Sequence, residues 1–371
     1  MTHRAINFNP GPAALPLAAL ERARDEFTDF AGTGMAVAEV SHRSREYEAV
    51  HNEAIALVRE LLALPAGFRV LLLQGGASLQ FAMLPLNLLG QGASADYVLS
   101  GNWAERAHGE ARAVAGDRAR VAGSTKGEGY RRLPNRDEIR PGRDAAYLHF
   151  CSNNTIEGTQ WQAFPAADGT PLACDMSSDF LSRRFDPAPF GIIYAGAQKN
   201  AGPAGLAVVI VREDILGRCD GSLPAILQYR VHADRNSLYN TPPTLAVYLL
   251  RNVLDDLRAR GGVAAAEERN REKAALLYDC IDRHAGFYHG HVSDPADRSL
   301  MNATFTLPST ELEDRFVDHS EAGGMVGLRG HRDLGGLRVS MYNAVTVENV
   351  RTLVSFMDEF ARRHGREDTT R

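Results

Sequence analysis

Residues 191–214 read GIIYAGAQKNAGPAGLAVVIVRED. Two strongly apolar runs, typical of buried strands, enclose a short loop rich in glycine and alanine, and Lys199 lies in that loop. A lysine held between buried strands loses hydration, which lowers the pKa of its amine and favours the neutral form that attacks an aldehyde. The alternative is a lysine that extends from a tight turn into solvent, and the rest of the sequence has to discriminate between the two.

Apolar runs of the same kind lie on both sides of this segment and alternate with longer helical patterns between about residues 16 and 262. This alternation is typical of an α/β fold, in which helices cover a mostly parallel sheet. The runs expected to form strands are 69–73, 96–100, 146–151, 171–174, 191–194 and 206–211. Several end in Gly, Ser, Asn or Asp, and open α/β sheets bind ligands at the carboxyl ends of their strands.

The pattern changes after Gly261 and Gly262, where a long amphipathic helix runs to about His284. Shorter strands follow, and then a final helix over about 347–363 with apolar residues at three- and four-residue spacing. A chain of 371 residues also favours two hydrophobic cores over one. We therefore predict a large domain over 16–262 and a smaller α+β domain over 1–15 and 263–371.

Composition excludes several classes of protein. The net charge of -5 gives no basic field for nucleic acid, and no segment approaches the roughly 18 apolar residues that a membrane helix needs. The first residues contain no apolar targeting segment, so we predict a cytoplasmic protein with neither nucleic-acid nor membrane partners. Lysine occurs only at Lys126, Lys199 and Lys273, so an anionic ligand would have to be bound largely by arginines.

The four cysteines lie far apart without a C-x-x-C pair, which argues against disulfides and against a zinc site. The pair of histidines at 289 and 291 has no third ligand at suitable spacing, so a solvated turn is the stronger interpretation. We expect no metal.

Other strand ends supply groups that suit a pyridoxal cofactor. Asp175 follows the run 171–174. A carboxylate beside the ring nitrogen keeps that nitrogen of a pyridoxal ring protonated. Taken alone, Asp175 is equally consistent with an Asp that caps a turn. The glycine-rich turn 74–80 opens a helix, where backbone N–H groups bind anions such as the cofactor phosphate. Trp103 is suited to stack on the ring, although most tryptophans are simply core residues, and Thr155 lies at another strand end. The coincidence of such residues at the ends of several different strands is far less probable by chance than the occurrence of any one of them.

Almost the whole chain resembles the bacterial phosphoserine aminotransferases, which belong to the class-V aminotransferases. The segments that carry the resemblance are FNPGPAALP (8–16), EVSHRS (39–44), GGASLQF (75–81), GNWAERA (101–107), SNNTIEGTQ (152–160), YAGAQKNAGPAG (194–205), YNTPPT (239–244) and GHRDLGGLRVSMYNA (330–344). The resemblance implies the type I fold of pyridoxal-phosphate enzymes, like that of aspartate aminotransferase. It also implies a homodimer with active sites at the interface.

The resemblance further implies a role for each matching residue. Lys199 would hold pyridoxal 5'-phosphate as a Schiff base, Asp175 would pair with the ring nitrogen and Trp103 would stack on the ring. The remaining cofactor contacts would be Ala77, Ser78, Thr155 and Gln198, together with Asn240 and Thr241 reaching the phosphate of the cofactor in the other subunit. Some relatives carry an arginine in the loop where this chain has Ala77 and Ser78, so phosphate binding would depend more on N–H groups here.

For the substrates, the resemblance implies that Arg338 binds the α-carboxylate. The residues meeting the substrate phosphate or the side-chain carboxylate of glutamate would be His42, Arg43, His331 and Arg332. The implied ping-pong reaction converts L-glutamate and 3-phosphohydroxypyruvate into 2-oxoglutarate and O-phospho-L-serine, a step of L-serine biosynthesis. Amination of 3-hydroxy-2-oxo-4-phosphobutanoate in pyridoxine (vitamin B6) biosynthesis, which some relatives carry out, stays open.

Two alternative functions have to be compared with this one. Another small type I aminotransferase, acting for instance on alanine or serine with glyoxylate, would not need the pair His331 and Arg332. A nucleotide-binding protein of the Rossmann type needs G-x-G-x-x-G after an early strand, and GGASLQ has the wrong spacing.

Overall fold

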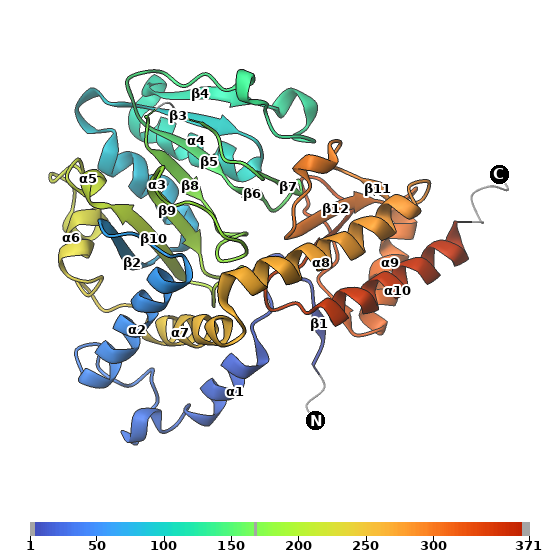
Figure 1. Ribbon diagram of the computed structural model, residues 1–371, viewed down its shortest axis with the longest axis horizontal. Helices are drawn as coiled ribbons and strands as arrows, with labels where there is room; N and C mark the ends of the chain where they lie inside the picture. Colours follow the sequence, from blue (N-terminus) through green and yellow to red (C-terminus); the bar gives the residue numbers. More distant parts are fainter. Residues whose placement is uncertain (1–3, 167–168, 366–371) are drawn as a thin grey trace.

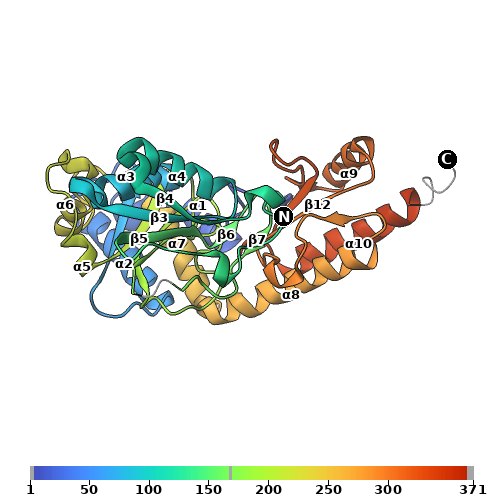
Figure 2. The same ribbon diagram turned by 90° about the horizontal axis from the view of Figure 1, so that it is seen from above.

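The computed structural model describes residues 4–166 and 169–365. Residues 1–3 and 366–371 of the predicted small domain, and 167–168 of the predicted large domain, lie outside the described residues. Figures 1 and 2 show a larger group of elements around a central sheet and a smaller group at one end, with α8 (Gly262–Arg283) extending from the first group into the second.

The central sheet has seven strands, and each of the six predicted strands is one of them. In spatial order they are β2 (Phe68–Gln74), β10 (Leu206–Arg212), β9 (Phe190–Gly196), β8 (Leu172–Asp175), β5 (Ala145–Cys151), β3 (Ser94–Leu99) and β4 (Ala119–Ser124). Strand β10 is antiparallel to both of its neighbours, and the other pairs are parallel. The prediction of an α/β fold with a mostly parallel sheet is confirmed.

Strand β4 was not predicted from the sequence. It lies at the edge of the sheet and pairs only with β3 among the described residues. In its sequence, ARVAGS, only Ala119 and Ala122 are buried, and the other positions are partly or fully exposed. The continuous apolar run that marks a central parallel strand is therefore missing.

Helices cover both faces of the sheet. They are α1 (Leu17–Asp25), α2 (Arg45–Leu61), α3 (Gly76–Leu88), α4 (Asn102–Ala115), α5 (Glu213–Leu216), α6 (Tyr229–Asp234) and α7 (Thr244–Ala259). Alternate side chains of β2 enter two different apolar clusters, with Val70 and Leu72 meeting α2 and α7, and Leu71 and Leu73 meeting α3, α4 and α6. The turns at the carboxyl ends of the strands are thereby fixed from both sides.

The smaller group, here named the C-terminal lobe, has a separate core. Its elements are α8, β11 (His289–Gly290), β12 (Asn302–Thr306), α9 (Thr310–Ala322), β13 (Met325–Val326), β14 (Leu337–Ser340), α10 (Val347–His364) and, from the N-terminus, β1 (Ile6–Asn7). A third apolar cluster contains Phe8 and residues between 274 and 361. A separate core of this kind supports the predicted domain boundaries at 15/16 and 262/263, which stay a prediction.

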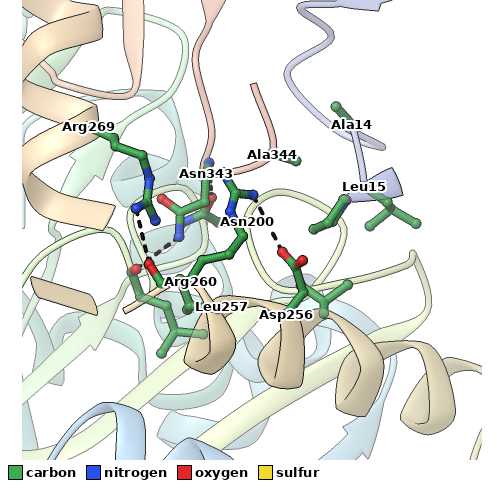
Figure 3. A pocket seen from close by; sticks show the side chains of 12 residues that line it. Ala14, Leu15, Asn200, Asp256, Leu257, Arg260, Arg269, Asn343 and Ala344 are labelled. Carbon is green, nitrogen blue, oxygen red and sulfur yellow. Dashed lines mark hydrogen bonds and ion pairs between the residues drawn. The ribbon is translucent and has the colours of Figure 1, made fainter. Parts of the chain in front are cut away.

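The junction between the sheet and the C-terminal lobe contains a small crevice beside α7 (Figure 3). Asn343 joins the two sides, since its backbone N–H donates to the Asn200 side chain at 2.8 Å and its amide nitrogen donates to the Leu181 carbonyl at 2.9 Å. The Asn270 side chain of α8 donates in turn to Asn343 at 2.9 Å. These bonds fix the segment that follows β14 against the loop that carries Lys199.

No helix within the described ranges has both the length and the apolar character needed to cross a membrane.

Candidate cofactor and substrate site

A cavity of about 510 Å³ opens at the carboxyl ends of β2 and β8, beside the turn that follows β9. Its volume lies within the range of about 300–1,000 Å³ that is common for small-molecule sites. Six of the residues predicted to bind a cofactor line it together: Ala77, Ser78, Trp103, Asp175, Gln198 and Lys199. They come from four separate segments, as the reasoning from strand ends anticipated.

Lys199 extends its amine into this cavity from the turn between β9 and β10. The Nζ atom donates a hydrogen bond to Thr155 Oγ1 at 2.6 Å and lies 5.3 Å from the centre of the Trp103 ring. Burial lowers the pKa of Lys199, and the negative charge of Asp175 opposes this lowering only in part. The site therefore favours the neutral amine, which is the nucleophilic form.

Asp175 is 7% exposed and has its two carboxylate oxygens in different surroundings. Oδ1 accepts hydrogen bonds from the backbone N–H of Ser177 at 2.8 Å and from the Ser177 hydroxyl at 2.5 Å. Among the described residues, the one partner of Oδ2 is the Cys151 thiol at 4.0 Å. Burial raises the pKa of Asp175, while Lys199 and Ser177 lower it, so a cationic partner would favour the ionised carboxylate. Oδ2 is the oxygen left to provide that pairing.

The start of α3 forms an anion-binding turn. Gly75 and Gly76 have φ values of 85° and 59°, and a Cβ at Gly75 would lie 2.7 Å from the Leu79 side chain, so residue 75 has to be glycine. The amides of Ala77 and Ser78 belong to the first turn of α3, where no intrahelical carbonyl accepts from them. With the positive end of the helix dipole they attract an anionic group.

These residues fit pyridoxal phosphate. The cavity offers an amine, a carboxylate, a row of free amides and an indole ring, and the buried Nε1 of Trp103 has no partner among the described residues. Lys199 would hold the cofactor aldehyde, Asp175 the ring nitrogen, Trp103 the ring face, and Ala77 and Ser78 the phosphate. When bound, the cofactor supplies an aldehyde that takes up an amino group and a ring that accepts electrons from the α-carbon.

Arg338 enters the same region from β14 of the C-terminal lobe. It is 5% exposed, its Nη1 donates to the Thr155 carbonyl at 3.2 Å, and its buried Nε has no partner. Within residues 4–166 and 169–365, no carboxylate forms an ion pair with it. Burial lowers the pKa of Arg338, while Tyr342 and Glu157 raise it. A buried cation without an anion is costly, and a substrate carboxylate would relieve that cost.

The loop between β13 and β14 brings further positive charge near Arg338. Burial lowers the pKa of His331 there, and the cations Arg338, Arg332 and Arg106 lower it further while Asp333 opposes them. His331 Nδ1 accepts from the Asp333 backbone N–H at 3.2 Å. The Arg332 side chain is 85% exposed and lies 3.7 Å from the Asp333 carboxylate. His331 therefore lies within the electrostatic reach of the site, whereas Arg332 extends into solvent.

Eight predicted site residues do not line the cavity itself: Thr155, His331, Arg332 and Arg338, described above, and His42, Arg43, Asn240 and Thr241. His42 and Arg43 lie in the turn before α2, where Arg43 is exposed. Asn240 and Thr241 lie in the segment before α7, where Thr241 is exposed and the Asn240 amide donates to its carbonyl at 3.1 Å. All four are available to another molecule.

Three site residues escaped the sequence analysis. Ser177 orients Asp175, and the guanidinium of Arg106 lies 4.9 Å from the centre of the Trp103 ring. Gly11 lines the cavity, and a Cβ there would lie 3.2 Å from Lys199 Cγ. The spacing of Ser177 and Arg106 from recognised residues was a usable signal, because Asp commonly bonds the residue two positions on and helical residues three apart share a face. Gly11 lies in the segment FNPGPAALP (8–16), which carries the family resemblance, but no chemical group marks it as a site residue.

Comparisons with known proteins agree with this geometry. The family model for class-V aminotransferases matches residues 5–353. The chain is 53% identical to the phosphoserine aminotransferase of Niallia circulans over 98% of this chain and 100% of the relative. A solved phosphoserine aminotransferase from Bacillus circulans subsp. alkalophilus superposes with a TM-score of 0.94 at 52% identity, covering 98% of this chain and 100% of that one. The phosphoserine aminotransferase of Trichomonas vaginalis with bound PLP superposes with a TM-score of 0.89 at 38% identity, covering 96% of this chain and 100% of that one.

Fold and cavity together define a pyridoxal-phosphate-dependent aminotransferase with the type I fold. The chain belongs to the phosphoserine aminotransferase family, within the class-V aminotransferases. The family, fold and cofactor implied by the sequence motifs are thereby confirmed.

Proposed function

We propose that the protein transfers the amino group of L-glutamate to 3-phosphohydroxypyruvate, giving 2-oxoglutarate and O-phospho-L-serine for L-serine biosynthesis. The observation that carries this is the pairing of a half-buried Lys199, whose pKa is lowered by burial, with a buried Arg338 that has no ion pair among the described residues, both in contact with Thr155. An amino acid whose carboxylate meets Arg338 places its α-carbon beside the Lys199 amine. The amine is then in position to remove and return the α-proton.

The substrate phosphate is proposed to meet a cluster of arginine and histidine side chains near the cavity. His331 is close enough to Arg338 for that cation to lower its pKa, and the exposed Arg332 side chain can turn inward. His42 and Arg43 belong to this cluster only if a second chain brings them there. Guanidinium groups match the oxygens of a phosphate with paired, charge-assisted hydrogen bonds.

A homodimer is part of the proposal. Four of the predicted site residues that do not line the single-chain cavity, His42, Arg43, Asn240 and Thr241, lie in two segments that carry partly or fully exposed positions, and Tyr239 beside them is 44% exposed. A two-fold interface over these segments would place them at the partner's cavity. Localisation in the cytoplasm is also proposed, and all four cysteines are buried free thiols, as in proteins of reducing compartments.

The two half-reactions test the proposal separately. Glutamate alone should abolish the visible absorbance of the bound cofactor and release one 2-oxoglutarate per chain, and 3-phosphohydroxypyruvate should then restore the absorbance and yield O-phosphoserine. Faster conversion by alanine or serine, or better restoration by glyoxylate, would instead assign another small aminotransferase. Restoration by 3-hydroxy-2-oxo-4-phosphobutanoate measures the additional role in pyridoxine biosynthesis.

A further inference from the structure

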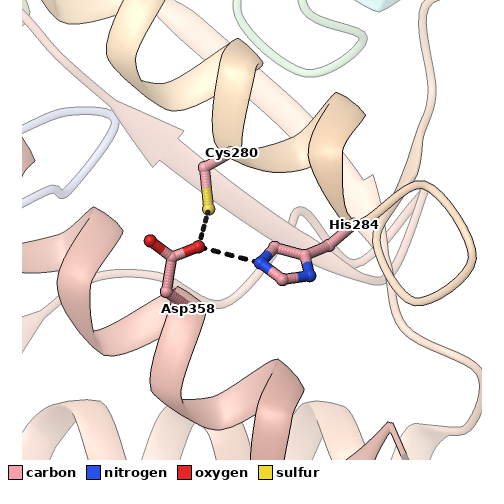
Figure 4. A group of neighbouring side chains, drawn as sticks. All are labelled: Cys280, His284 and Asp358. Atoms are coloured by element: carbon pink, nitrogen blue, oxygen red, sulfur yellow. Dashed lines mark hydrogen bonds and ion pairs between the residues drawn. The ribbon is translucent and has the colours of Figure 1, made fainter.

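A cluster of three potential metal ligands lies in the C-terminal lobe, away from the cofactor cavity (Figure 4). Cys280 and His284 come from the last turn of α8 and its C-terminal cap, and Asp358 comes from α10. Residues four apart on a helix lie on the same face, so both α8 side chains meet the neighbouring helix. The cluster therefore bridges the two long helices of the lobe.

Two of the three distances between the ligand atoms are close to those of a metal site. Cys280 Sγ is 3.6 Å and His284 Nε2 is 2.8 Å from the same oxygen, Oδ1 of Asp358, and all three ligand atoms lie within 4.8 Å of one another. In a tetrahedral zinc site with ordinary bond lengths, sulfur and oxygen would be about 3.5 Å apart and nitrogen and oxygen about 3.3 Å apart. The rearrangement required is a few tenths of an ångström for each of these two distances.

Without a metal, Asp358 acts as the acceptor of the cluster. The Cys280 thiol and the His284 N–H both donate to it. Burial raises the pKa of the Cys280 thiol to about 12, and the nearby Asp358 carboxylate adds to this, so the sulfur keeps its proton. Cys280 is fully buried, whereas the side chains of His284 and Asp358 are 24% and 35% exposed and leave a path from solvent.

One neighbour competes with a metal. Arg283 Nη2 lies 2.9 Å and 3.1 Å from the two oxygens of Asp358. Its side chain is 52% exposed, so it can move into solvent when a dication takes its place. A thiolate and a carboxylate together balance the two positive charges of the metal.

We propose that Cys280, His284 and Asp358 bind a zinc-type divalent cation that links α8 to α10, with water as the fourth ligand. The thiol proton leaves on binding, and the cation replaces the two hydrogen bonds that now converge on Asp358. Cysteine spacing gave no sign of this site, because Asp358 lies 78 positions from Cys280 and only the fold brings them together. The site lies outside the cofactor cavity and does not depend on the proposed reaction.

Calorimetric titration of the reduced holoenzyme with zinc chloride tests the site directly. One zinc ion per chain is expected, and the melting temperature should rise with zinc. Cys280→Ser and, as a second variant at a more exposed position, His284→Ala should each weaken binding by at least about 10- to 100-fold, because even the loss of an outer partner of a ligand has this effect. Cys219→Ser, which alters another buried free thiol on the large sheet unit, should bind zinc like the parent.

Arg283→Ala provides the test of opposite sign. Removal of the competing cation should tighten zinc binding. Absence of one-to-one binding in both the parent and Arg283→Ala, or equal affinities in the parent, Cys280→Ser and His284→Ala, would overturn the proposal and leave the cluster as a hydrogen-bonded contact between helices.

Discussion

At the scale of single residues, the site contains groups whose ionised forms are disfavoured by burial. Lys199 shifts toward the neutral amine and Asp175 toward the protonated acid. Arg338 is buried with one backbone carbonyl as its partner and no carboxylate in the part of the chain that the structure describes. Each of these groups gains when a ligand of opposite charge enters.

The first prediction concerns Lys199. Lys199→Ala should lower the rate of the glutamate half-reaction by at least about 10²- to 10⁴-fold, the usual contribution of a positioned proton-transfer group. Stopped-flow absorbance measures this. Lys126→Ala is the matched control, since Lys126 is 66% exposed and pairs with Glu105 on the surface. Borohydride should fix the cofactor to Lys199 in the parent enzyme, and a reduced adduct on Lys126 or Lys273 would contradict the assignment.

The second prediction distinguishes the roles of the two arginines that are proposed to bind the substrate. Arg338→Leu should reduce kcat/KM for both glutamate and 3-phosphohydroxypyruvate, because both carry an α-carboxylate. The reduction should correspond to a loss of about 1.5–3 kcal/mol of transition-state stabilisation. Arg332→Leu should affect mainly the phosphorylated substrate. Arg329→Leu is a suitable control, since Arg329 pairs with Asp314 outside the cavity. Equal small effects of Arg332→Leu on both half-reactions would remove it from the phosphate site.

At the scale of elements, sequence patterns located the strands that carry continuous apolar runs and missed the strands that do not. The apolar run 206–211 became β10 and the run 69–73 became β2, since both are covered on both faces. Edge strand β4 and the short hairpin of β6 (Asn153–Asn154) and β7 (Thr159–Gln160) carry no such run. The hairpin positions Thr155 through tertiary contacts, which local sequence does not encode.

The third prediction concerns the turn before α3. Gly75→Ala combines a left-handed backbone with a Cβ placed 2.7 Å from Leu79, so it should cost more than the strain of about 1–3 kcal/mol expected from the backbone alone. Gly67→Ala is the matched control, because Gly67 has a similar φ of 87° and open space around it. Urea denaturation and cofactor dissociation should both separate the two variants. Equal effects would show that the close approach to Leu79 is unimportant.

At the scale of the whole molecule, the site depends on how the C-terminal lobe meets the sheet. Lys199 belongs to the sheet and Arg338 to the lobe, and Lys273 of α8 lies at their junction. The buried Nζ of Lys273 lies within hydrogen-bond distance of three carbonyls, those of Met341 at 2.8 Å, Tyr342 at 2.9 Å and Val345 at 3.0 Å. It thereby holds the segment that directly follows β14.

The fourth prediction tests this junction. Lys273→Met should destabilise the protein by about 1–3 kcal/mol for each carbonyl left without another donor. Burial lowers the pKa of Lys273 to about 7, with Arg269 and Arg260 contributing. The unfolded chain then binds more protons between pH 7 and about 10, so the free energy of unfolding should rise with pH across this window in the parent. The pH series should lose that slope in Lys273→Met and keep it in Lys126→Met.

The last prediction concerns residues that are proposed to act across the subunit interface. Motifs singled out His42, Arg43, Asn240 and Thr241, yet none lines the cavity that contains Lys199. Patterns in a sequence assign a residue to a helix, strand or loop of its own chain. Whether that residue enters the site of a partner depends on how a second copy of the chain packs against the first.

Mixed dimers decide whether these residues act across that interface. In a heterodimer of Lys199→Ala with the double variant His42→Ala and Arg43→Leu, one site carries both defects and the other carries none. Each variant alone should be nearly inactive, and unfolding and refolding an equal mixture should restore about a quarter of the parent sites, because half of randomly paired two-fold dimers are mixed and each has one intact site. Residues acting within their own chain would leave every site defective, so the mixture would stay inactive. A mixture of Lys199→Ala with Arg338→Leu is the matched control, since both of these residues serve the same chain's cavity and no mixed dimer would then contain an intact site.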